Sequence, residues 1–223
     1  MTYHRLAALT AGSLIAGAHA AQADGFYISA NIGSTNTDHT LTRSAFTPGL
    51  PVPDVGGVGR AETTDFSGGL AFGYEYDIPS TEFYLGAEAF YTFEDGNSRN
   101  IVGVLVTDVS LENTYGARVI GGVDITDQFS LYGHLGYTEV DFNVTNSYTF
   151  APPVTRASRS EGALSFGIGA KYDVNDRIAI FSEYTKIPDV DFAGIPEVAG
   201  GTGRINPNSL ELDKISFGVR LSF

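Results

Sequence analysis

The last ten residues of the chain alternate strictly between apolar and polar side chains. From Lys214 onward every second residue is apolar, and these residues are Ile215, Phe217, Val219, Leu221 and Phe223. A period of two over this length predicts a β-strand with one apolar and one polar face. The C-terminal segment is the clearest structural signal in the sequence.

Seven earlier segments show weaker versions of the same alternation. They are Phe26–Gly33, Asp65–Tyr76, Glu82–Glu94, Leu111–Asp124, a strand that begins at Gln128, Glu161–Tyr172 and Arg177–Lys186. The phase breaks at Ile120 and Phe181, which fall on the polar faces of their strands. After Tyr137 the apolar set moves to the opposite parity, at Val140, Phe142 and Val144. A bulge, or a strand that emerges from a membrane, would explain this last change.

The connections between these segments alternate between short and long. Residues 77–81, 125–127 and 173–176 are short turns, whereas four long segments rich in Pro, Gly, Asn, Thr and charge are predicted to be loops: Ser34–Thr64, Asp95–Ser110, Thr145–Ser160 and Asp189–Ser209. Ile187–Phe192 is expected to continue the seventh strand above the membrane. Bacterial outer-membrane barrels have short periplasmic turns, long extracellular loops and an even number of strands. The fold predicted is therefore all-β, an eight-stranded antiparallel up-and-down transmembrane β-barrel with both termini in the periplasm.

A soluble eight-stranded barrel would point its apolar face inward instead. The polar faces of the predicted strands carry many small residues, among them Gly69, Gly73, Gly116 and Gly167. The interior of an eight-stranded barrel has room only for side chains. Small residues with a few charges therefore suit the lumen, and the bulky Phe, Leu and Ile residues suit lipid.

The N-terminus has the features of a secretory signal peptide. Arg5 precedes the apolar segment Leu6–Ala18, and small residues permit cleavage after Ala20 or Ala23. We therefore assign residues 1–23 to the signal peptide and residues 24–223 to the barrel. Cleavage after Ala20 removes one Arg and no acidic residue, which takes the formal net charge from -13 to -14. A chain this acidic is not expected to bind nucleic acid, and a chain without cysteine has no disulfide or thiolate metal site.

Two motifs resemble a known family. The segment Ile215–Phe223 looks like the terminal signal read by the barrel-assembly machinery, and Phe181-Ser182-Glu183-Tyr184 is similar to a Glu-Tyr pair in the penultimate strand. The chain thus resembles the outer-membrane β-barrel superfamily of small OmpX-type and opacity-protein-like porin-family proteins. The resemblance implies a location in the outer membrane of a Gram-negative bacterium. The expected partners are membrane lipid, with the barrel-assembly machinery and periplasmic chaperones during biogenesis, and a monomer is expected.

Charged residues on the polar faces are the first candidates for a functional site. Seven project into the predicted lumen: Glu75, Glu88, Arg118, Lys171, Glu183, Lys214 and Arg220. Because unpaired buried charges are costly, a network of ion pairs and hydrogen bonds is expected across the barrel. We expect Lys214 and Arg220 to meet lumen acids such as Glu183. The network has a structural interpretation, in which it fills and rigidifies the barrel, and a functional one, as a selectivity filter or proton path.

The histidines offer weak support for catalysis. His39 falls in the first predicted loop, and His134 faces inward on the fifth strand, with Ser130 on the same face. Four residues along a strand span about 13 Å, which is beyond hydrogen-bond reach. Residues 173–176 lack the length, Gly and terminal Glu of a calcium-binding loop. We therefore expect no catalytic, cofactor or metal site.

Three functions are compatible with these observations. The first is a non-enzymatic barrel with a packed polar lumen, which has a structural or surface-interaction role and binds an extracellular ligand through its loops. The alternative is a narrow porin-like channel or transporter for small or hydrophobic solutes, and a lipid-modifying enzyme that uses His134 is a weaker third. The apolar, Pro-bearing loop Ser34–Thr64 either docks a partner, folds over the barrel mouth or is an ordinary surface loop.

Overall fold

The computed structural model describes residues 25–43, 56–103, 105–148, 151–193 and 207–223. Within these residues the chain forms nine β-strands and no helix. The strands are β1 (Phe26–Arg43), β2 (Gly57–Asp77), β3 (Phe83–Glu94), β4 (Asn97–Val102), β5 (Leu105–Thr126), β6 (Phe129–Tyr148), β7 (Ala151–Asn175), β8 (Ile178–Ala193) and β9 (Pro207–Ser222). In the described part of the chain there is accordingly no helix long and apolar enough to cross a membrane. The predicted signal peptide lies outside the described residues.

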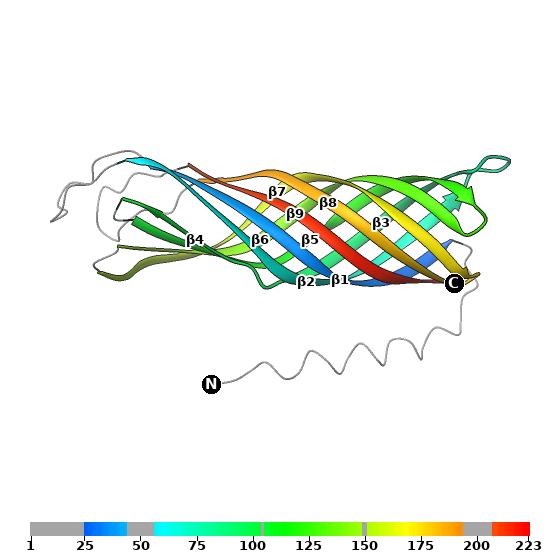
Figure 1. Ribbon diagram of the computed structural model, residues 1–223, viewed down its shortest axis with the longest axis horizontal. Helices are drawn as coiled ribbons and strands as arrows, with labels where there is room; N and C mark the ends of the chain where they lie inside the picture. The colour runs from blue at the N-terminus through cyan, green and yellow to red at the C-terminus, as the bar shows by residue number, and fades with distance from the viewer. Residues whose placement is uncertain (1–24, 44–55, 104, 149–150, 194–206) are drawn as a thin grey trace, which may run out of the picture.

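The strands form one closed antiparallel ring with eight strand positions (Figure 1). The ring has eight positions rather than nine because β3 and β4 lie one after the other against the same strand, β5. It closes where β1 pairs with β9, from Tyr27 opposite Ser222 to Leu41 opposite Asn208. The predicted fold class, an eight-stranded antiparallel barrel, is confirmed.

Three tight turns and the C-terminus lie at one end of the barrel (Figure 1). In the turn between β2 and β3 the N–H of Ile78 donates to the carbonyl of Phe83 at 2.9 Å. In the turn between β7 and β8 the side-chain oxygen of Asn175 accepts from the N–H groups of Arg177 and Ile178, both at 3.0 Å. Asn is favoured in such turns because its side chain bonds the backbone two residues further on. These are the turns that the sequence predicted.

Near the turns the outer face of the barrel is a belt of large apolar side chains. Ile168 is 68% exposed and Phe66 is 64% exposed. The belt spans outward positions from Leu164 to Tyr172 on β7 and from Ile215 to Val219 on β9. A transmembrane strand needs about 9–11 residues to cross the hydrocarbon. We call the part of the barrel within this belt the membrane half, and the part beyond it, away from the turns, the distal half.

In the distal half the large apolar side chains lie on the inward face of the strands and not on the outward face. On β6 the outward Tyr137 is exposed, whereas Val140 and Phe142, two positions of the opposite parity, are completely buried inside. No register shift of β6 against β7 separates these residues, because pairing runs without a break from Tyr137 opposite Leu164 to Phe142 opposite Arg159. The change of phase in the sequence is therefore the point at which the strand leaves the membrane, and not a bulge in β6.

Where the structure describes the four long connections they are almost entirely strand, so the loop predictions were wrong for those residues. β1 continues to Arg43, β6 continues to Tyr148 and the segment after β3 forms β4 and the start of β5. The expected continuation through Ile187–Phe192 is present in β8. In the distal part of β1 both strand faces carry mainly polar residues, inward at Thr35, Thr37 and His39, so composition suggested a loop there. Residues 44–55 of the first long connection and residues 194–206 of the fourth lie outside the described residues.

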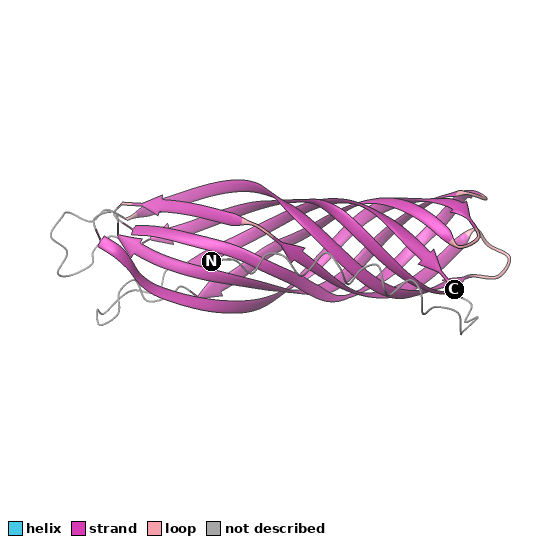
Figure 2. Cartoon of the chain, turned by 90° about the horizontal axis from the view of Figure 1, so that it is seen from below, coloured by secondary structure: helices cyan, strands magenta, loops and turns pink. Residues whose placement is uncertain are grey.

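The distal half separates into two sheets. β7 pairs with β8 only from Phe166 to Asn175, and β2 pairs with β3 only up to Ser67. Among the described residues no backbone pairing joins β2 to β4. One sheet therefore has the order β8–β9–β1–β2 and the other the order β4–β5–β6–β7. Figure 2 shows the strands spaced more widely toward this end.

Apolar side chains fill the space between the two sheets. We call this cluster the distal core, and it consists of Val109, Leu111, Val140, Phe142, Val144, Ala163, Ile187, Val190, Phe192, Leu210 and Leu212. Phe142 and Phe192 join the two sheets at its centre, with ring centroids 4.7 Å apart. The prediction of a polar lumen therefore holds for the membrane half, whereas the distal half has an apolar core beside a few buried polar residues such as His39 and Asn208. The distal half is built like a small soluble β-sandwich.

Replacement of Val140 by Asp tests this division of the barrel. An unpaired carboxylate in the distal core should destabilise the distal half by about 3 kcal/mol or more, while the membrane half still closes. We expect new trypsin cleavage in the distal strands, together with normal heat-modifiable gel mobility. The matched variant Thr145→Asp places the same charge on the outer face of the same strand and should resist trypsin. Equal resistance of both variants would contradict the two-sheet core.

Candidate functional site

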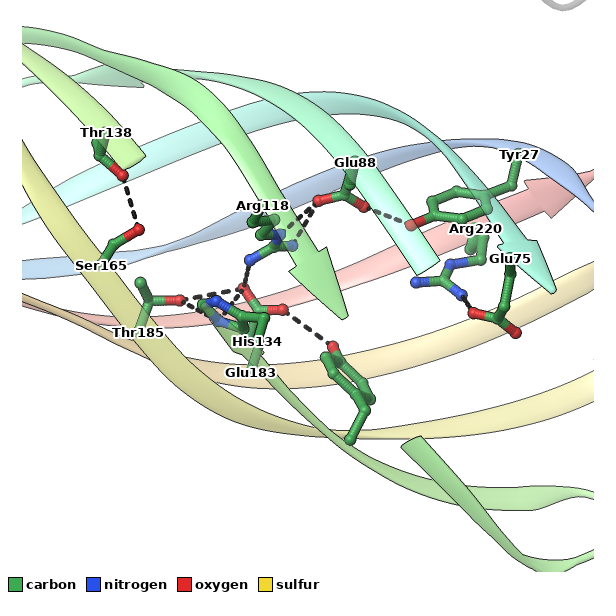
Figure 3. A network of polar contacts seen from close by, with 11 residues as sticks. Tyr27, Glu75, Glu88, Arg118, His134, Thr138, Ser165, Glu183, Thr185 and Arg220 are labelled. Carbon is green, nitrogen blue, oxygen red and sulfur yellow. Dashed lines mark hydrogen bonds and ion pairs between the residues drawn. The ribbon is translucent and has the colours of Figure 1, made fainter. Parts of the chain in front are cut away.

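A buried ion-pair network crosses the lumen of the membrane half (Figure 3). At its centre the Arg118 guanidinium lies between two carboxylates, 2.6 Å from Glu88 and 2.6 Å from Glu183. Glu88 on β3 is the direct cross-strand neighbour of Arg118 on β5, whereas Glu183 comes from β8, on another side of the ring. Tyr27 donates to Glu88 at 3.0 Å and Tyr132 donates to Glu183 at 3.1 Å. Each carboxylate is therefore held by a cation and by a phenol.

A second group of charges lies toward the turns. Glu75 accepts from Lys171 at 2.5 Å and from Arg220 at 2.6 Å. The Arg220 guanidinium carbon also lies 3.8 Å from the centre of the Tyr27 ring, a cation–π contact. Since Tyr27 also donates to Glu88, it joins the two groups into one network.

A third ion pair lies toward the distal half. Lys214 pairs there with Glu94, which also accepts hydrogen bonds from Thr35 at 2.7 Å and Thr114 at 3.0 Å. Glu94 is a member of the inward face that the sequence analysis missed, because it stands at the end of its predicted strand. Its even spacing from Glu88 was the signal that placed it on the same face.

The seven charges named from the sequence all point into the lumen and all make ion pairs. Their expected partners were partly wrong. Lys214 meets Glu94 and Arg220 meets Glu75, whereas Glu183 is taken by Arg118. The phenols of Tyr27 and Tyr132 were also missed, although their parity places them inside.

The C-terminal residues take the faces that their alternation predicts. Ile215, Phe217 and Val219 are at least half exposed on the outer belt, and Leu221 and Phe223 are partly covered. Their role as a signal for barrel assembly stays a prediction.

His134 has no serine within hydrogen-bond distance among the described residues. Its Nε2 atom lies 3.2 Å from the hydroxyl of Thr185 and 3.7 Å from Glu183. Ser130, the residue considered from the sequence, donates to Asp124 at 2.6 Å instead. No group of three or more His, Cys, Asp or Glu side chains in the described part of the chain is arranged to hold a metal ion. His134 is thus a member of the lumen network.

A small polar cavity separates the charge network from the distal core. It has a volume of about 40 Å³ and is lined by residues of both layers, including Arg118, His134, Ser165 and Ile187. A space of this size holds about three water molecules. At its wall, Thr138 of β6 donates to Ser165 of the neighbouring strand β7 at 2.8 Å (Figure 3). The interior is therefore filled at two levels, by ion pairs in the membrane half and by apolar side chains in the distal half.

His39 belongs to strand β1 and not to a loop, which corrects the sequence prediction. Its side chain is completely buried beyond the apolar belt, with the ring 6.5 Å from that of Phe192. The Nε2 atom lies 3.3 Å from the side-chain oxygen of Asn208, and the Nδ1 atom has no partner. Burial lowers the pKa of His39 below the ordinary value, although the Asn208 contact and the charge of Asp38 act in the opposite direction.

Comparison with known proteins identifies the family. The family model described as "Outer membrane protein beta-barrel domain" matches residues 6–223. The chain belongs to this outer-membrane β-barrel family. The protein therefore lies in the outer membrane of a Gram-negative bacterium, with its apolar belt in the bilayer. A comparison with curated protein sequences gives no significant match.

Solved structures share the fold at low sequence identity. Neisserial surface protein A is 16% identical, with 90% of this chain and 98% of that one covered and a TM-score of 0.48. The outer membrane protein OprG from Pseudomonas aeruginosa is 13% identical, with 90% and 96% covered and a TM-score of 0.47. The outer membrane protease OmpT from Escherichia coli is 10% identical, with 90% and 97% covered and a TM-score of 0.52. At such identities the likeness concerns the fold alone.

The substitution Arg118→Ala tests the lumen network. It leaves Glu88 and Glu183 buried without their cation, and we expect it to lower the free energy of unfolding by about 3–5 kcal/mol. Urea unfolding in detergent, followed by heat-modifiable gel mobility, measures the change. Arg99→Ala is the control, because the Arg99–Asp108 pair is exposed and screened by water, so its loss should change stability far less. Similar losses in the two variants would contradict a central role for the network.

The buried His39 predicts a pH dependence of the distal half. Because its pKa is lowered in the folded state, stability should be undiminished above pH 6.5 and should fall as the pH drops from there toward the lowered value. Hydrogen exchange of the β1 amides, corrected for intrinsic rates between pH 7.5 and 5, reports this loss. In His39→Leu the dependence should largely disappear. An unchanged slope in that variant would assign the effect to another group.

Proposed function

We propose that this protein is a non-enzymatic outer-membrane barrel that acts through the surface it presents outside the cell. The single observation that supports the proposal best is that the interior of the barrel is filled at two levels. A lumen that holds buried ion pairs at one level and a closed apolar core at another leaves little room for a solute. What remains available to other molecules is the outside of the distal half and its loops.

The outer wall of the distal half is rich in acidic residues. They include Asp38, Glu62, Glu112, Glu139, Asp141, Glu211 and Asp213. Some of them have local partners, such as Lys186, which lies 2.5 Å from Glu211 and 3.3 Å from Asp213. A rigid sandwich raised above the bilayer is suited to hold such a surface, and the loops above it, at a fixed distance from the membrane. This supports a role in contact with molecules or surfaces outside the cell.

A narrow channel is the second candidate, and one observation favours it. The periplasmic mouth is an open acidic vestibule of about 230 Å³, lined among others by Glu75, Asp77, Asp124 and Asp173. Such a mouth would attract small cations by its field. Passage beyond it would require the Glu75 pairs and then the Arg118 pairs to separate, so we rank this candidate below the first.

Two measurements on the same protein discriminate between these functions. Purified barrel in planar bilayers should give no conductance above that of empty membranes, because its lumen is filled. Cells that display it should attach to protein-coated surfaces more than cells that lack it. The triple variant Glu139→Gln, Asp141→Asn, Asp213→Asn should alter this attachment by severalfold without change in heat-modifiable mobility. Steady cation conductance, or attachment independent of the barrel, would contradict the proposal.

A further inference from the structure

The distal part of β7 has a strand neighbour on one side only. β6 pairs with it continuously from Thr155 toward the turns, whereas β8 pairs with it only from Phe166 onward. Among the described residues, the other edge of Thr155–Ser165 therefore carries N–H and C=O groups without a strand partner. Ser158, Arg159 and Ser160 are all exposed, although consecutive strand residues face opposite sides. Both faces are thus accessible around Arg159, as expected for a free sheet edge, whereas the inward Ala163 and Ser165 nearer the membrane half are buried.

The strand that faces this edge carries the features that prevent pairing. In β8, Pro188 has no N–H to donate, and Asp189 has a φ of 49° within a register shift between Ile187 and Val190. A proline, a bulge and charge are the usual means by which proteins protect an edge. β7 has none of these bends between Thr155 and Ser165, and its register against β6 is regular there.

The far edge of the same sheet is covered. β4 lies against β2, where Gly59 packs so closely on the side chain of Asn100 that a Cβ atom would lie 2.1 Å from its oxygen. Asn100 also donates to the carbonyl of His39 at 3.1 Å. This hydrogen bond connects β4 to β1 of the opposite sheet. Of the two edges of this sheet, the one at β7 is therefore the accessible one.

Two cations stand on the accessible edge. Arg156 and Arg159 are exposed and make no ion pair with any described residue. The nearest acidic residue along β7 is the half-buried Glu161. The adjacent strand β6 carries Glu139 and Asp141. Small side chains such as Ser158 leave the backbone between the two cations open. In a chain of net charge -13, guanidinium groups that pair with no described acid favour acidic residues opposite them.

We propose that the edge of β7 over Thr155–Gly162 binds an extended acidic segment of a partner protein, which adds to the sheet as a further β-strand. This inference rests on the proposed function in surface contact and specifies the chemistry of the partner. Main-chain hydrogen bonds supply the affinity in this mode of recognition, and alternate side chains supply the specificity. Acidic side chains of the partner lie beside Arg156 and Arg159.

The inner face of the added strand meets a different environment. Ala157 packs partly buried against the distal core, and Ala163 is a member of it. Arg159 and Glu161 share this inward parity, so inward residues of the partner contact small apolar side chains and these two charges. The segment expected is about eight residues long, or about 26 Å, and it alternates apolar with polar residues around two acids three positions apart.

A synthetic peptide with this pattern tests the inference. The probe is a fluorescein-labelled octapeptide of alternating Val and Thr with Glu at its third and sixth positions, titrated into the full barrel in lipid nanodiscs. We expect saturable binding by fluorescence anisotropy and slower hydrogen exchange of the amides of residues 155–162. A peptide with Lys in place of both Glu residues should bind at least tenfold more weakly than the Glu peptide. A Glu peptide that is N-methylated at alternate amides should also bind at least tenfold more weakly.

Charge reversal on the barrel provides the matched controls. Arg156→Glu with Arg159→Glu should weaken the Glu peptide at least tenfold and strengthen the Lys peptide. Arg60→Glu makes the same change at an exposed arginine of β2 and should leave both affinities unchanged. No binding of the Glu peptide, equal effects of all the reversals, or exchange protection outside β7 would overturn the inference. If cells still attach when the peptide does not bind, the proposed function stands and only this inference fails.

Discussion

The requirement that every backbone polar group be paired inside a bilayer explains the shape of this molecule. Lipid offers no hydrogen bonds, so a sheet that crosses it must close on itself. The ring is complete within the apolar belt, where β2 pairs with β3 and β7 pairs with β8. Both pairings stop close to the edge of the belt, near Ser67 and Phe166. Beyond that level water can satisfy the backbone, and the barrel is free to flatten into two sheets.

The same change of surroundings explains the two interiors. In the membrane half the bulky side chains face lipid, so the narrow lumen must be filled by polar groups and their charges must be paired. Arg118, which pairs with both Glu88 and Glu183, is at the centre of this charge network. In the distal half water surrounds the outer wall, and the apolar residues turn inward as in a soluble protein. One strand, β6, carries both patterns while its register against β7 stays regular from Phe129 to Asn146.

These constraints also bear on function. A barrel filled at two levels is poorly suited to transport, while a raised sandwich with one exposed edge is suited to contact with other molecules. Where the bilayer no longer demands closure, the chain protects the β8 edge with Pro188 and a bulge and leaves the β7 edge open. An edge without a proline or a bulge is open to pairing with another strand. The arginines at that edge, in an otherwise acidic wall, are consistent with such a use.

The sequence by itself determined the class, the strand number and the lipid-facing side, because a period of two is a local property of the chain. The alternation of Ile215, Phe217 and Val219 needs no knowledge of any other strand. Parity alone also placed the seven lumen charges. Which charges meet was decided by the curvature and stagger of the closed ring, which set Lys214 beside Glu94 and Arg220 beside Glu75. The extended strands and the burial of His39 likewise depended on the tertiary structure, since polar residues on both strand faces resemble a loop until two sheets pack together.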